Sequence, residues 1–419
     1  MYLGLTGINH RTAPVAIREK VAVSTEKLPG ALVRLRRYLP HGLILSTCNR
    51  TEIYLAGLQD HDLTRACTDF FQEISLLPTD KIAPYLYSLK DRAMVEHLCE
   101  VSCGLDSMVI GEYEILGQVG QALEGAEKAG MVNLPLRHLF QGAIRTGRRV
   151  REETGISKNA LSVSSIAVNK ALDIIPDISN AKIVILGAGE AGKLAVKVVK
   201  SRGASKISVM SRTEERAVCL TSQYGGRPAA FNRLAQELCD ADLVIACATS
   251  PHPVLHYQQV KGAMSNRPEL PMIIIDIAVP RNAETTIQEI TNVHLYNLDD
   301  LNVVADGHRL QREAEIASVI KIVAEEVNIL MKWWQAHSVR PVIKSLVNRA
   351  DRIRTAQYNR AIKKLSSLTK EEKASVDLLT RSIVDKILRD PIMYLKSGDG
   401  RDAEEVISRL FNLEDGTEP

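Results

Sequence analysis

The sequence lacks the features that mark membrane, secreted and disulfide-bonded proteins. No uncharged run approaches the ~20 apolar residues of a bilayer-spanning helix. The start, Met1–Gly7, reads as a strand and lacks the basic-then-apolar order of a signal peptide. The seven cysteines are odd in number and scattered without disulfide-type spacing. We therefore expect a soluble cytoplasmic protein with no membrane partner.

Net charge and aromatic content are also low. The net charge is +3 over 419 residues, and aromatic residues make up 4% of the chain. So small a net charge does not by itself indicate nucleic-acid binding, which only local clusters of basic residues would support. The length suggests two or three domains of ~150 residues each.

The first part of the chain predicts a small α+β domain, residues 1–156. Strands are expected at 2–8, 44–45 and 53–56, with a helix beginning at Val15 and another at 25–39 capped by Ser24. From about residue 63 to 153 the apolar spacing is helical and is punctuated by glycines.

A nucleotide-binding domain is expected over residues 157–298. A buried strand at 181–186 runs into a G-x-G-x-x-G turn and then a helix, which is the context that this motif requires. Its residues are Gly187, Ala188, Gly189, Glu190, Ala191 and Gly192. Further strands at 206–210, 241–247, 272–277 and 293–296 predict a doubly wound parallel sheet of the Rossmann type, and Cys219, Cys239 and Cys247 are interpreted as core residues.

The end of the second strand indicates which nucleotide is bound. An NAD site normally has Asp or Glu there for the ribose 2′-hydroxyl, whereas this chain has Ser211, Arg212 and Thr213. A guanidinium and two hydroxyls suit a 2′-phosphate, which favours NADPH. Residues 248–250 and 278–281 follow later strands, where such folds hold the nicotinamide.

Residues 299–419 predict a long spinal helix followed by a helical dimerisation domain. The helical pattern from 299 to about 337 has only Gly307 to interrupt it and suits a spacer between domains. After Pro341, shorter helices are expected at about 342–366, 370–388 and 402–412. The last residues, 413–419, are expected to fray.

The polar cluster Ser46–Glu52 stands between two short strands and contains the main candidate for chemistry. It sets the thiol of Cys48 beside the guanidinium of Arg50 at the end of a sheet. Nearby positive charge lowers a thiol pKa and increases the nucleophilic thiolate. The alternative is a small core cysteine next to a surface arginine.

Two other groups of residues have both a structural and a functional interpretation. His97 lies among apolar residues at helical spacing, which is typical of a core histidine. Cys99 and Cys103 are four residues apart and could share a helix face, but His97 and Cys99 would point about 200° apart, so we expect no metal site. The basic run from Arg137 to Lys158, with Arg148, Arg149 and Arg151 close together, is either a solvated helix face or a phosphate-binding surface.

A reactive cysteine and an NADPH-type domain together suggest reduction through a thioester. A thioester carbonyl accepts hydride more readily than an ester, so Cys48 would attack an acyl ester, expel an alcohol and leave an acyl-enzyme that NADPH reduces to an aldehyde.

At these motifs the sequence resembles the glutamyl-tRNA reductase family over essentially its full length. The motifs are residues 7–14, 46–52, 102–107, 111–112 with 115–119, 187–192, 211–213 and 276–281. The resemblance implies reduction of glutamyl-tRNA(Glu) to glutamate-1-semialdehyde with release of tRNA, the first step of the five-carbon route to 5-aminolevulinate, porphyrins and haem. It implies an α/β and α architecture of an N-terminal catalytic domain, an NADPH domain and a dimerisation domain along a spinal helix.

The resemblance also implies roles for individual residues. The nucleophile falls on Cys48, and a histidine important for activity falls on His97, either as partner of the thiolate or as proton donor to the leaving hydroxyl. Substrate contacts fall on Thr47, Asn49, Arg50, Ser107, Glu112, Tyr113, Glu114 and Gln118. Arg50 is the candidate for the substrate γ-carboxylate. Tyr113 and Glu114 depart from the family pattern, in which Pro or a small residue and then Gln are usual.

The implied partners are charged tRNA(Glu), a second copy of the chain in a homodimer, and the aminomutase that consumes the aldehyde. Two other functions stay open: an NADPH-dependent dehydrogenase of a small free acid, which would not need the cysteine motif, and a dimeric tRNA- or protein-binding module without reductase chemistry.

Overall fold

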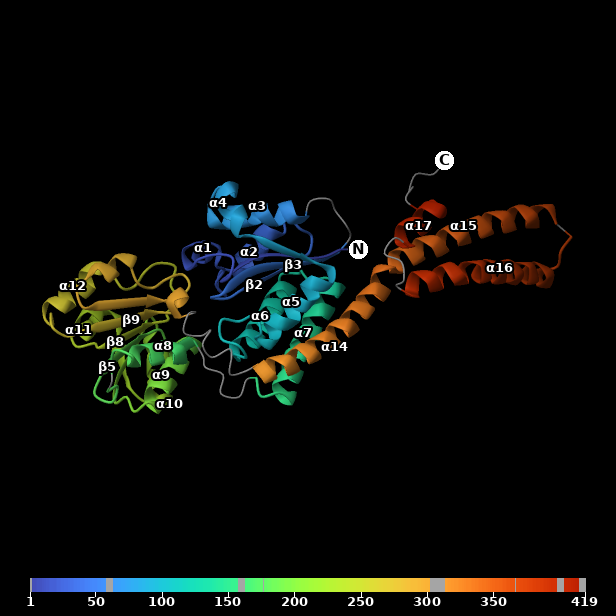
Figure 1. Cartoon of the computed structure of the whole chain (residues 1–419). Coiled ribbons are helices and arrows are strands. Elements are labelled where there is room, and N and C mark those ends of the chain that lie inside the picture. The colour runs from blue at the N-terminus through green and yellow to red at the C-terminus, as the bar shows by residue number, and fades with distance from the viewer. Residues whose placement is uncertain are drawn as a thin grey trace. The chain divides into compact units, whose positions relative to one another are not determined.

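The computed structural model describes residues 2–57, 63–156, 163–175, 177–301, 313–365, 367–397 and 403–413. The chain divides into two compact units, Tyr2–Val327 and Asn328–Pro419. Within the first unit, Figure 1 shows a mixed α and β domain in blue and cyan and a second α/β domain in green and yellow. The predictions for Lys158, Gly307 and residues 414–419 lie outside the described residues.

The N-terminal domain is built on a four-stranded sheet in the order β2-β3-β1-β4. Its strands are β1 (Tyr2–Asn9), β2 (Leu43–Ser46), β3 (Arg50–Gly57) and β4 (Tyr87–Lys90), and all neighbours are antiparallel. The sequence reading missed β4. It is a short edge strand with two half-buried and two exposed residues, and it is held mainly by its pairing with β1.

Helices pack on this sheet, and those between residues 63 and 153 agree with the helical spacing predicted there. They are α1 (Val15–Val21), α2 (Leu28–Leu35), α3 (Leu63–Ser75), α4 (Thr79–Ile82), α5 (Asp91–Cys103), α6 (Glu114–Lys128) and α7 (Leu134–Glu153). The predicted helix 25–39 is correct only in its centre, because turns occupy both of its ends. Asn133 caps α7 by accepting from the Leu136 amide at 3.1 Å.

The second domain is the predicted doubly wound sheet. Its order is β10-β9-β8-β5-β6-β7, and every neighbouring pair is parallel. The strands are β5 (Lys182–Leu186), β6 (Lys206–Ser211), β7 (Arg227–Ala230), β8 (Leu243–Ala246), β9 (Met272–Asp276) and β10 (Val293–Asn297). The sequence reading missed β7, an edge strand that contains Pro228.

Alternating strand residues face two separate cores. Ile183 and Ile185 face one core with α8 (Val163–Leu172), α9 (Glu190–Ser201) and α10 (Glu214–Tyr224). Val184 and Leu186 face the other, with α11 (Leu234–Leu238) and α12 (Tyr257–Ser265). Helices therefore cover both faces, as parallel sheets require.

The C-terminal part of the chain is helical. The long helix α14 (Glu313–Ser338) has 26 residues and is followed by α15 (Arg340–Lys364), which has Pro341 in its first turn and corresponds to the helix expected at about 342–366. Then come α16 (Lys370–Ser397) and α17 (Ala403–Leu410). α16 continues through Pro391 beyond the predicted end at 388. None of the helices in the described ranges combines the length and hydropathy needed to cross a bilayer.

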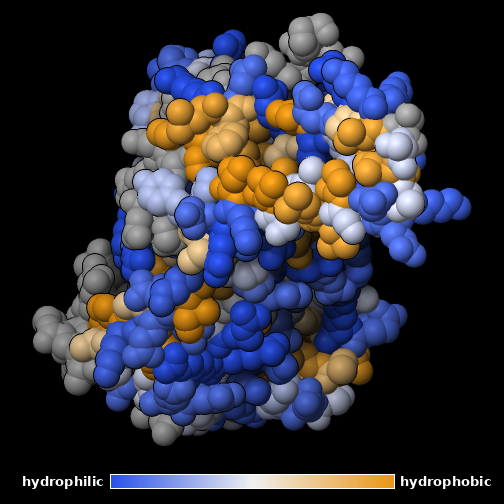
Figure 2. Space-filling view, turned by 90° about the vertical axis from the view of Figure 1, so that its right-hand side faces the viewer, coloured by the Kyte–Doolittle hydropathy of each residue, from blue (hydrophilic) through white to orange (hydrophobic). Residues whose placement is uncertain are grey.

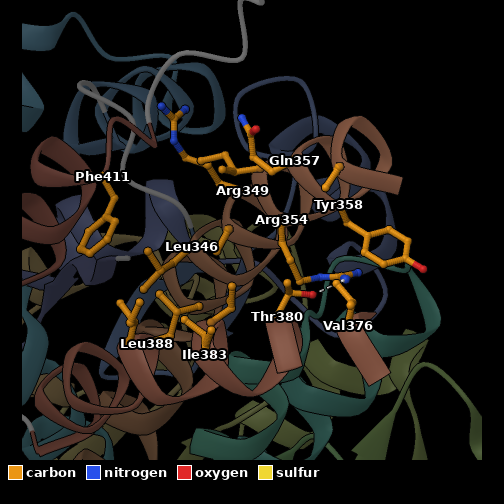
Figure 3. A pocket seen from close by; sticks show the side chains of 15 residues that line it. Leu346, Arg349, Arg354, Gln357, Tyr358, Val376, Thr380, Ile383, Leu388 and Phe411 are labelled. Atoms are coloured by element: carbon orange, nitrogen blue, oxygen red, sulfur yellow. Dashed lines mark hydrogen bonds between the residues drawn. The ribbon is translucent and has the colours of Figure 1, made fainter. Parts of the chain in front are cut away.

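The C-terminal unit leaves much apolar surface uncovered. A groove of about 480 Å³ runs between α15 and α16, and Figure 3 shows Leu346, Ile383 and Leu388 converging in it, with Phe411 at one side. Several apolar residues of α16 are at least half exposed, among them Leu378, Leu379 and Ile387. Figure 2 shows apolar side chains gathered across the upper part of the face that it presents.

Candidate active site

Cys48 lies at the tip of the turn between β2 and β3. Ser46 and Thr51 are paired across the two strands, and the Thr47 amide donates to the Arg50 carbonyl at 2.8 Å. The Asn49 amide donates to Thr47 Oγ1 at 3.1 Å, and the Asn49 carbonyl accepts from the His10 amide at 2.8 Å. The turn is thus held on both sides, and the predicted thiol at a sheet end is found there.

One cavity of about 360 Å³ brings this turn together with the nucleotide-binding domain. Eight of the residues predicted for catalysis or substrate binding line it: Thr47, Cys48, Asn49, Arg50, Ser107, Glu112, Glu114 and Gln118. The opposite wall comes from the second domain, with Glu190 and Ala191 from the glycine motif and Cys247, Thr249 and Val279 from beyond β8 and β9. Residues that are far apart in sequence therefore face a single space.

The surroundings of Cys48 do not lower its thiol pKa, which differs from the prediction. Burial raises the pKa of Cys48 to about 12, and the carboxylates of Glu112 and Glu114 add to this shift. The guanidinium of Arg18 opposes it. The predicted lowering of this pKa by Arg50 is not found, and the Arg50 guanidinium is paired with Glu52 and Asp106. The thiol consequently needs a proton acceptor before it can attack.

Arg50 lines the cavity and also belongs to a buried network that extends behind the cavity wall. Its Nη1 donates to Glu52 Oε1 at 2.6 Å, and both of its terminal nitrogens lie 3.0 Å from Asp106 Oδ2. The Arg50 side chain is 1% exposed and that of Glu52 is completely buried. A substrate carboxylate at Arg50 would therefore have to share the guanidinium with these two carboxylates or displace one of them.

His97 lies in the same network. Its Nε2 is 2.9 Å from Glu52 Oε1, 3.4 Å from Arg50 Nη1 and 3.4 Å from the Tyr87 hydroxyl. Among the described residues it has no hydrogen bond to Cys48, and it is not part of the cavity lining. The expectation of a well-satisfied buried histidine and that of an activity-linked histidine are both compatible with this position.

Glu112 and Glu114 place carboxylates on the wall beside Cys48. Burial raises the pKa of Glu112 to about 7, against the effect of a hydrogen bond from Ser107, and nearby Glu114 raises it further. Glu114 is the first residue of α6, and burial together with Glu190 raises its pKa as well. Tyr113, between them, is 62% exposed and is outside the lining of this cavity in the described structure.

The glycine turn has the shape of a dinucleotide site. A Cβ atom at Gly192 would lie 2.0 Å from the Gly187 carbonyl oxygen, and one at Gly187 would lie 2.7 Å from the Cys247 backbone. Gly189 caps α9 and has open space where a side chain would lie. Backbone can thus approach a pyrophosphate at a helix N-terminus, and these residues fit a nicotinamide dinucleotide.

Ser211, Arg212 and Thr213 are located where the ribose would be bound. β6 ends at Ser211, and α10 starts after its N-cap Thr213. Arg212 is exposed and donates to the Thr249 carbonyl at 2.7 Å, beside the cavity wall. No acidic residue stands in this three-residue segment, so a guanidinium is available for a 2′-phosphate.

The sequence reading missed Arg18, Glu52, Tyr87 and Asp106, whose contacts cross the domain. Glu52 and Asp106 lie inside the motifs that resemble the family, 46–52 and 102–107. Their position in these motifs could have identified them as candidate site residues. Cys219 was interpreted wrongly as core, because it is exposed on α10. Cys247 packs against the core of the second domain, as predicted, and it also lines the cavity.

The basic run does not form a uniform surface. Arg149 is paired with Glu153, Glu325 and Glu326 at 2.8–3.0 Å, and Arg151 donates to the carbonyls of Ser102, Gly147 and Glu112. Arg145 and Arg148 are exposed. The phosphate-binding interpretation therefore applies best to the exposed pair.

Fold and site together define an oxidoreductase with a Rossmann-type nucleotide-binding domain and a cysteine at the same cavity. Family models agree with this class in three segments. "Glutamyl-tRNAGlu reductase, N-terminal domain" matches residues 6–154, "Shikimate / quinate 5-dehydrogenase" matches 169–304, and "Glutamyl-tRNAGlu reductase, dimerisation domain" matches 318–413.

Whole-chain relatives identify the family. A glutamyl-tRNA reductase of Natranaerobius thermophilus is 37% identical over 100% of this chain and 93% of its own length, and one of Solibacter usitatus is 36% identical over 99% and 100%. The solved glutamyl-tRNA reductase of Methanopyrus kandleri is 30% identical, covers 99% of each chain and has a TM-score of 0.52. The chain belongs to the glutamyl-tRNA reductase family.

Proposed function

We propose that this protein uses NADPH to reduce the glutamyl group of glutamyl-tRNA(Glu) to glutamate-1-semialdehyde, with release of tRNA. This is the first step of tetrapyrrole synthesis by the five-carbon route. The observation that carries the proposal is the shared cavity, in which the Cys48 turn faces the glycine turn of the nucleotide-binding domain. Seven free cysteines, all at described positions, suit a cytoplasmic location.

The first chemical step is transfer of the glutamyl group to Cys48. The thiolate sulfur bonds to the ester carbonyl carbon, the ester C–O bond breaks, and the tRNA ribose leaves as a hydroxyl after gaining a proton. Because Glu112 lies near the thiol and has a pKa of about 7, we propose that it takes the Cys48 proton. His97 acts on this step through Glu52 and Arg50, since those residues are its hydrogen-bond partners.

The second step releases the aldehyde. Residues 187–192 and 211–213 would hold NADPH, which would supply the hydride to the thioester carbonyl carbon, so that the C–S bond breaks, the aldehyde forms and the Cys48 thiolate is freed. The chain contributes a cavity wall formed by Thr249, Ala278 and Val279 beside the thiol, which keeps bulk water from the thioester.

The cavity has polar groups that suit the ammonium and the γ-carboxylate of the glutamyl group. Asn49 is 3% exposed, and its Oδ1 is buried without a partner in the described structure, so it can accept from the substrate ammonium. Glu114 adds negative charge at the same wall. Arg50 is our candidate for the γ-carboxylate, in exchange for part of its contact with Asp106.

Partners follow from the surfaces. We assign the apolar groove of α15 and α16 to a second copy of the chain, because the family model matched there is a dimerisation domain. Arg145 and Arg148 are candidates for contacts with the tRNA backbone. An aminomutase that takes over the aldehyde is a further expected partner.

The test separates the two chemical steps. The protein is incubated with glutamyl-tRNA(Glu) without NADPH, and an adduct of glutamyl mass is sought on the peptide that contains Cys48. NADPH should then discharge the adduct as an aldehyde, and Cys48→Ser should form none. Turnover of a free acid without tRNA would favour the small-substrate dehydrogenase, and tRNA binding without either reaction would favour the binding module.

A further inference from the structure

Helix α1 presents two consecutive charged residues to the two walls of the cavity. Arg18 is 3% exposed, although arginine is seldom buried without function or full pairing. Its Nε donates to the Ala13 carbonyl at 3.2 Å, and its Nη1 donates to the Cys48 carbonyl at 2.7 Å. The turn that carries the thiol is thereby bound to α1.

The third donor of Arg18 crosses to the other domain. Its Nη2 forms an ion pair with Asp299, which follows the last strand of the nucleotide-binding domain. The second oxygen of Asp299 accepts from the Val15 amide at 2.8 Å, at the first residue of α1. One buried guanidinium therefore links the Cys48 carbonyl to the end of the nucleotide-binding domain.

Glu19 contacts the segment that forms part of the opposite wall, at Arg281. Its carboxylate pairs with Arg281 in a two-pronged contact, with Nε to Oε2 at 2.9 Å and Nη2 to Oε1 at 2.7 Å. Only 18% of the Glu19 side chain and 25% of that of Arg281 are exposed. Paired planar contacts of this kind fix orientation as well as distance.

The segment that contains Arg281 is itself rigidly held. Asp276, at the end of β9, accepts from the Ala278 amide at 3.0 Å, the Asn282 amide at 2.7 Å and the Ala283 amide at 2.8 Å. Ala278 and Val279 line the cavity, two to three residues from Arg281. A displacement of Arg281 is consequently passed on to the nicotinamide-side wall.

We propose that α1 is a positioning clamp for hydride transfer, in which Arg18 holds the Cys48 turn and Glu19 holds the 277–281 segment to one short helix. The inference rests on the proposed function. Hydride transfer requires donor and acceptor atoms within about 3–3.5 Å, and a displacement of ~1 Å can cost ~100-fold in rate. Transfer of the glutamyl group to Cys48 needs only the thiol wall, so the Glu19–Arg281 pair serves the second step alone.

The experiment measures both steps in single turnovers of the full-length protein. Formation of the glutamyl adduct on Cys48 is followed without NADPH, and discharge of the adduct is followed after NADPH is added. Glu19→Gln and Arg281→Gln should leave the rate of adduct formation within about twofold and slow discharge by roughly tenfold to a hundredfold at saturating NADPH.

Two further variants distinguish positioning from general damage. The exchange Glu19→Arg with Arg281→Glu recreates the pair and should restore discharge to within several-fold of the unmodified protein. Arg18→Lys keeps the charge but loses the fork of donors, so it should slow both steps. Arg37→Gln, which removes an ion pair with Glu73 elsewhere in the same domain, should change neither.

The outcomes also separate this inference from the proposed function. If the unmodified protein forms no adduct, the proposed function fails. If the unmodified protein forms and discharges the adduct but Glu19→Gln and Arg281→Gln discharge it at the normal rate, the clamp is wrong. Equal slowing of both steps by Glu19→Gln, or no rescue by the exchange, would likewise overturn it.

Discussion

Glu52 Oε1 lies 2.9 Å from His97 Nε2, inside the N-terminal domain and behind the cavity wall. The same carboxylate accepts from Arg50 at 2.6 Å and from the Tyr54 hydroxyl at 2.6 Å. Burial raises the pKa of Glu52, but Arg50 and His97 outweigh burial and hold it well below the usual range. Glu52 is therefore the ionised centre that fixes the arginine and the histidine in place.

This relationship predicts a pH-dependent loss of stability. A carboxylate whose pKa is lower in the folded than in the unfolded protein stabilises the fold at pH values above its ordinary pKa, near 4.3. This contribution is lost as the pH falls towards the folded-state pKa. Glu52→Gln should cost about 3 kcal/mol in the free energy of unfolding at pH 7, with a smaller difference below pH 4. Urea unfolding at both pH values measures this. Glu73→Gln, a partly exposed pair, should cost less than about 1 kcal/mol, and an equal effect of both variants would contradict the assignment.

The raised pKa of Glu112 predicts that stability decreases with rising pH, the opposite of the dependence expected for Glu52. The pKa of Glu112 is raised to about 7, mainly by burial, so its contribution to stability is complete below the ordinary value near 4.3 and is lost as pH rises through 7. Glu112→Gln should therefore be more stable than the unmodified protein by about 2 kcal/mol at pH 8.5 and nearly equal to it at pH 4.5. Denaturant titrations at the two pH values decide the matter. Glu124→Gln, on the exposed face of α6, is the control, and a constant difference across pH would refute the prediction.

Arg212 predicts the choice of nucleotide. Its guanidinium lies where an NAD-specific site has a carboxylate, so Arg212→Ala should raise the KM for NADPH roughly tenfold to a hundredfold and leave that for NADH nearly unchanged. Steady-state kinetics with both nucleotides measure the shift. Arg216→Ala, in the following helix α10, should affect neither KM. An equal rise in the KM for NADPH and in the KM for NADH would show that Arg212 does not recognise the 2′-phosphate.

The basic face of α7 predicts how tRNA binding responds to salt. Arg148 is exposed, whereas Arg149 is surrounded by three carboxylates. Arg148→Glu should weaken tRNA binding and reduce the slope of log affinity against log salt by about 1 or more. Arg149→Gln is the matched control and should change the slope less. tRNA binding by both variants is measured at several salt concentrations. An unchanged slope for Arg148→Glu would show that the basic run is a solvated helix face and not a phosphate-binding surface.

The groove in the C-terminal unit predicts where two copies meet. Ile383 and Ile387 are 48% and 63% exposed, and both line the groove. Ile383→Asp with Ile387→Asp should convert a dimer into a monomer at micromolar concentration, because charges would be buried in an apolar contact. Light scattering gives the mass. Lys386→Gln, on the same helix, should leave the dimer intact, and a persistent dimer in the double variant would place the interface elsewhere.

The sequence by itself determined the features that depend on local patterns. Alternating and helical apolar spacing predicted the strands that flank Cys48 and the parallel sheet, because burial of one face imposes the period of the element. The glycine turn was predictable since only glycine lets Gly192 approach the Gly187 carbonyl so closely. The edge strands β4 and β7 were missed, because their short and weakly buried residues leave little pattern.

Tertiary structure decided the charge state and partners of the site. Cys48 and Arg50 are neighbours in sequence, but burial and the carboxylates of Glu112 and Glu114 raise the thiol pKa, while Asp106 pairs with Arg50. Arg149 belongs to a basic run, yet Glu325 and Glu326, some 176 residues later, neutralise it. Electrostatic energies depend on distance and solvent exposure, and both are set only when distant segments pack together.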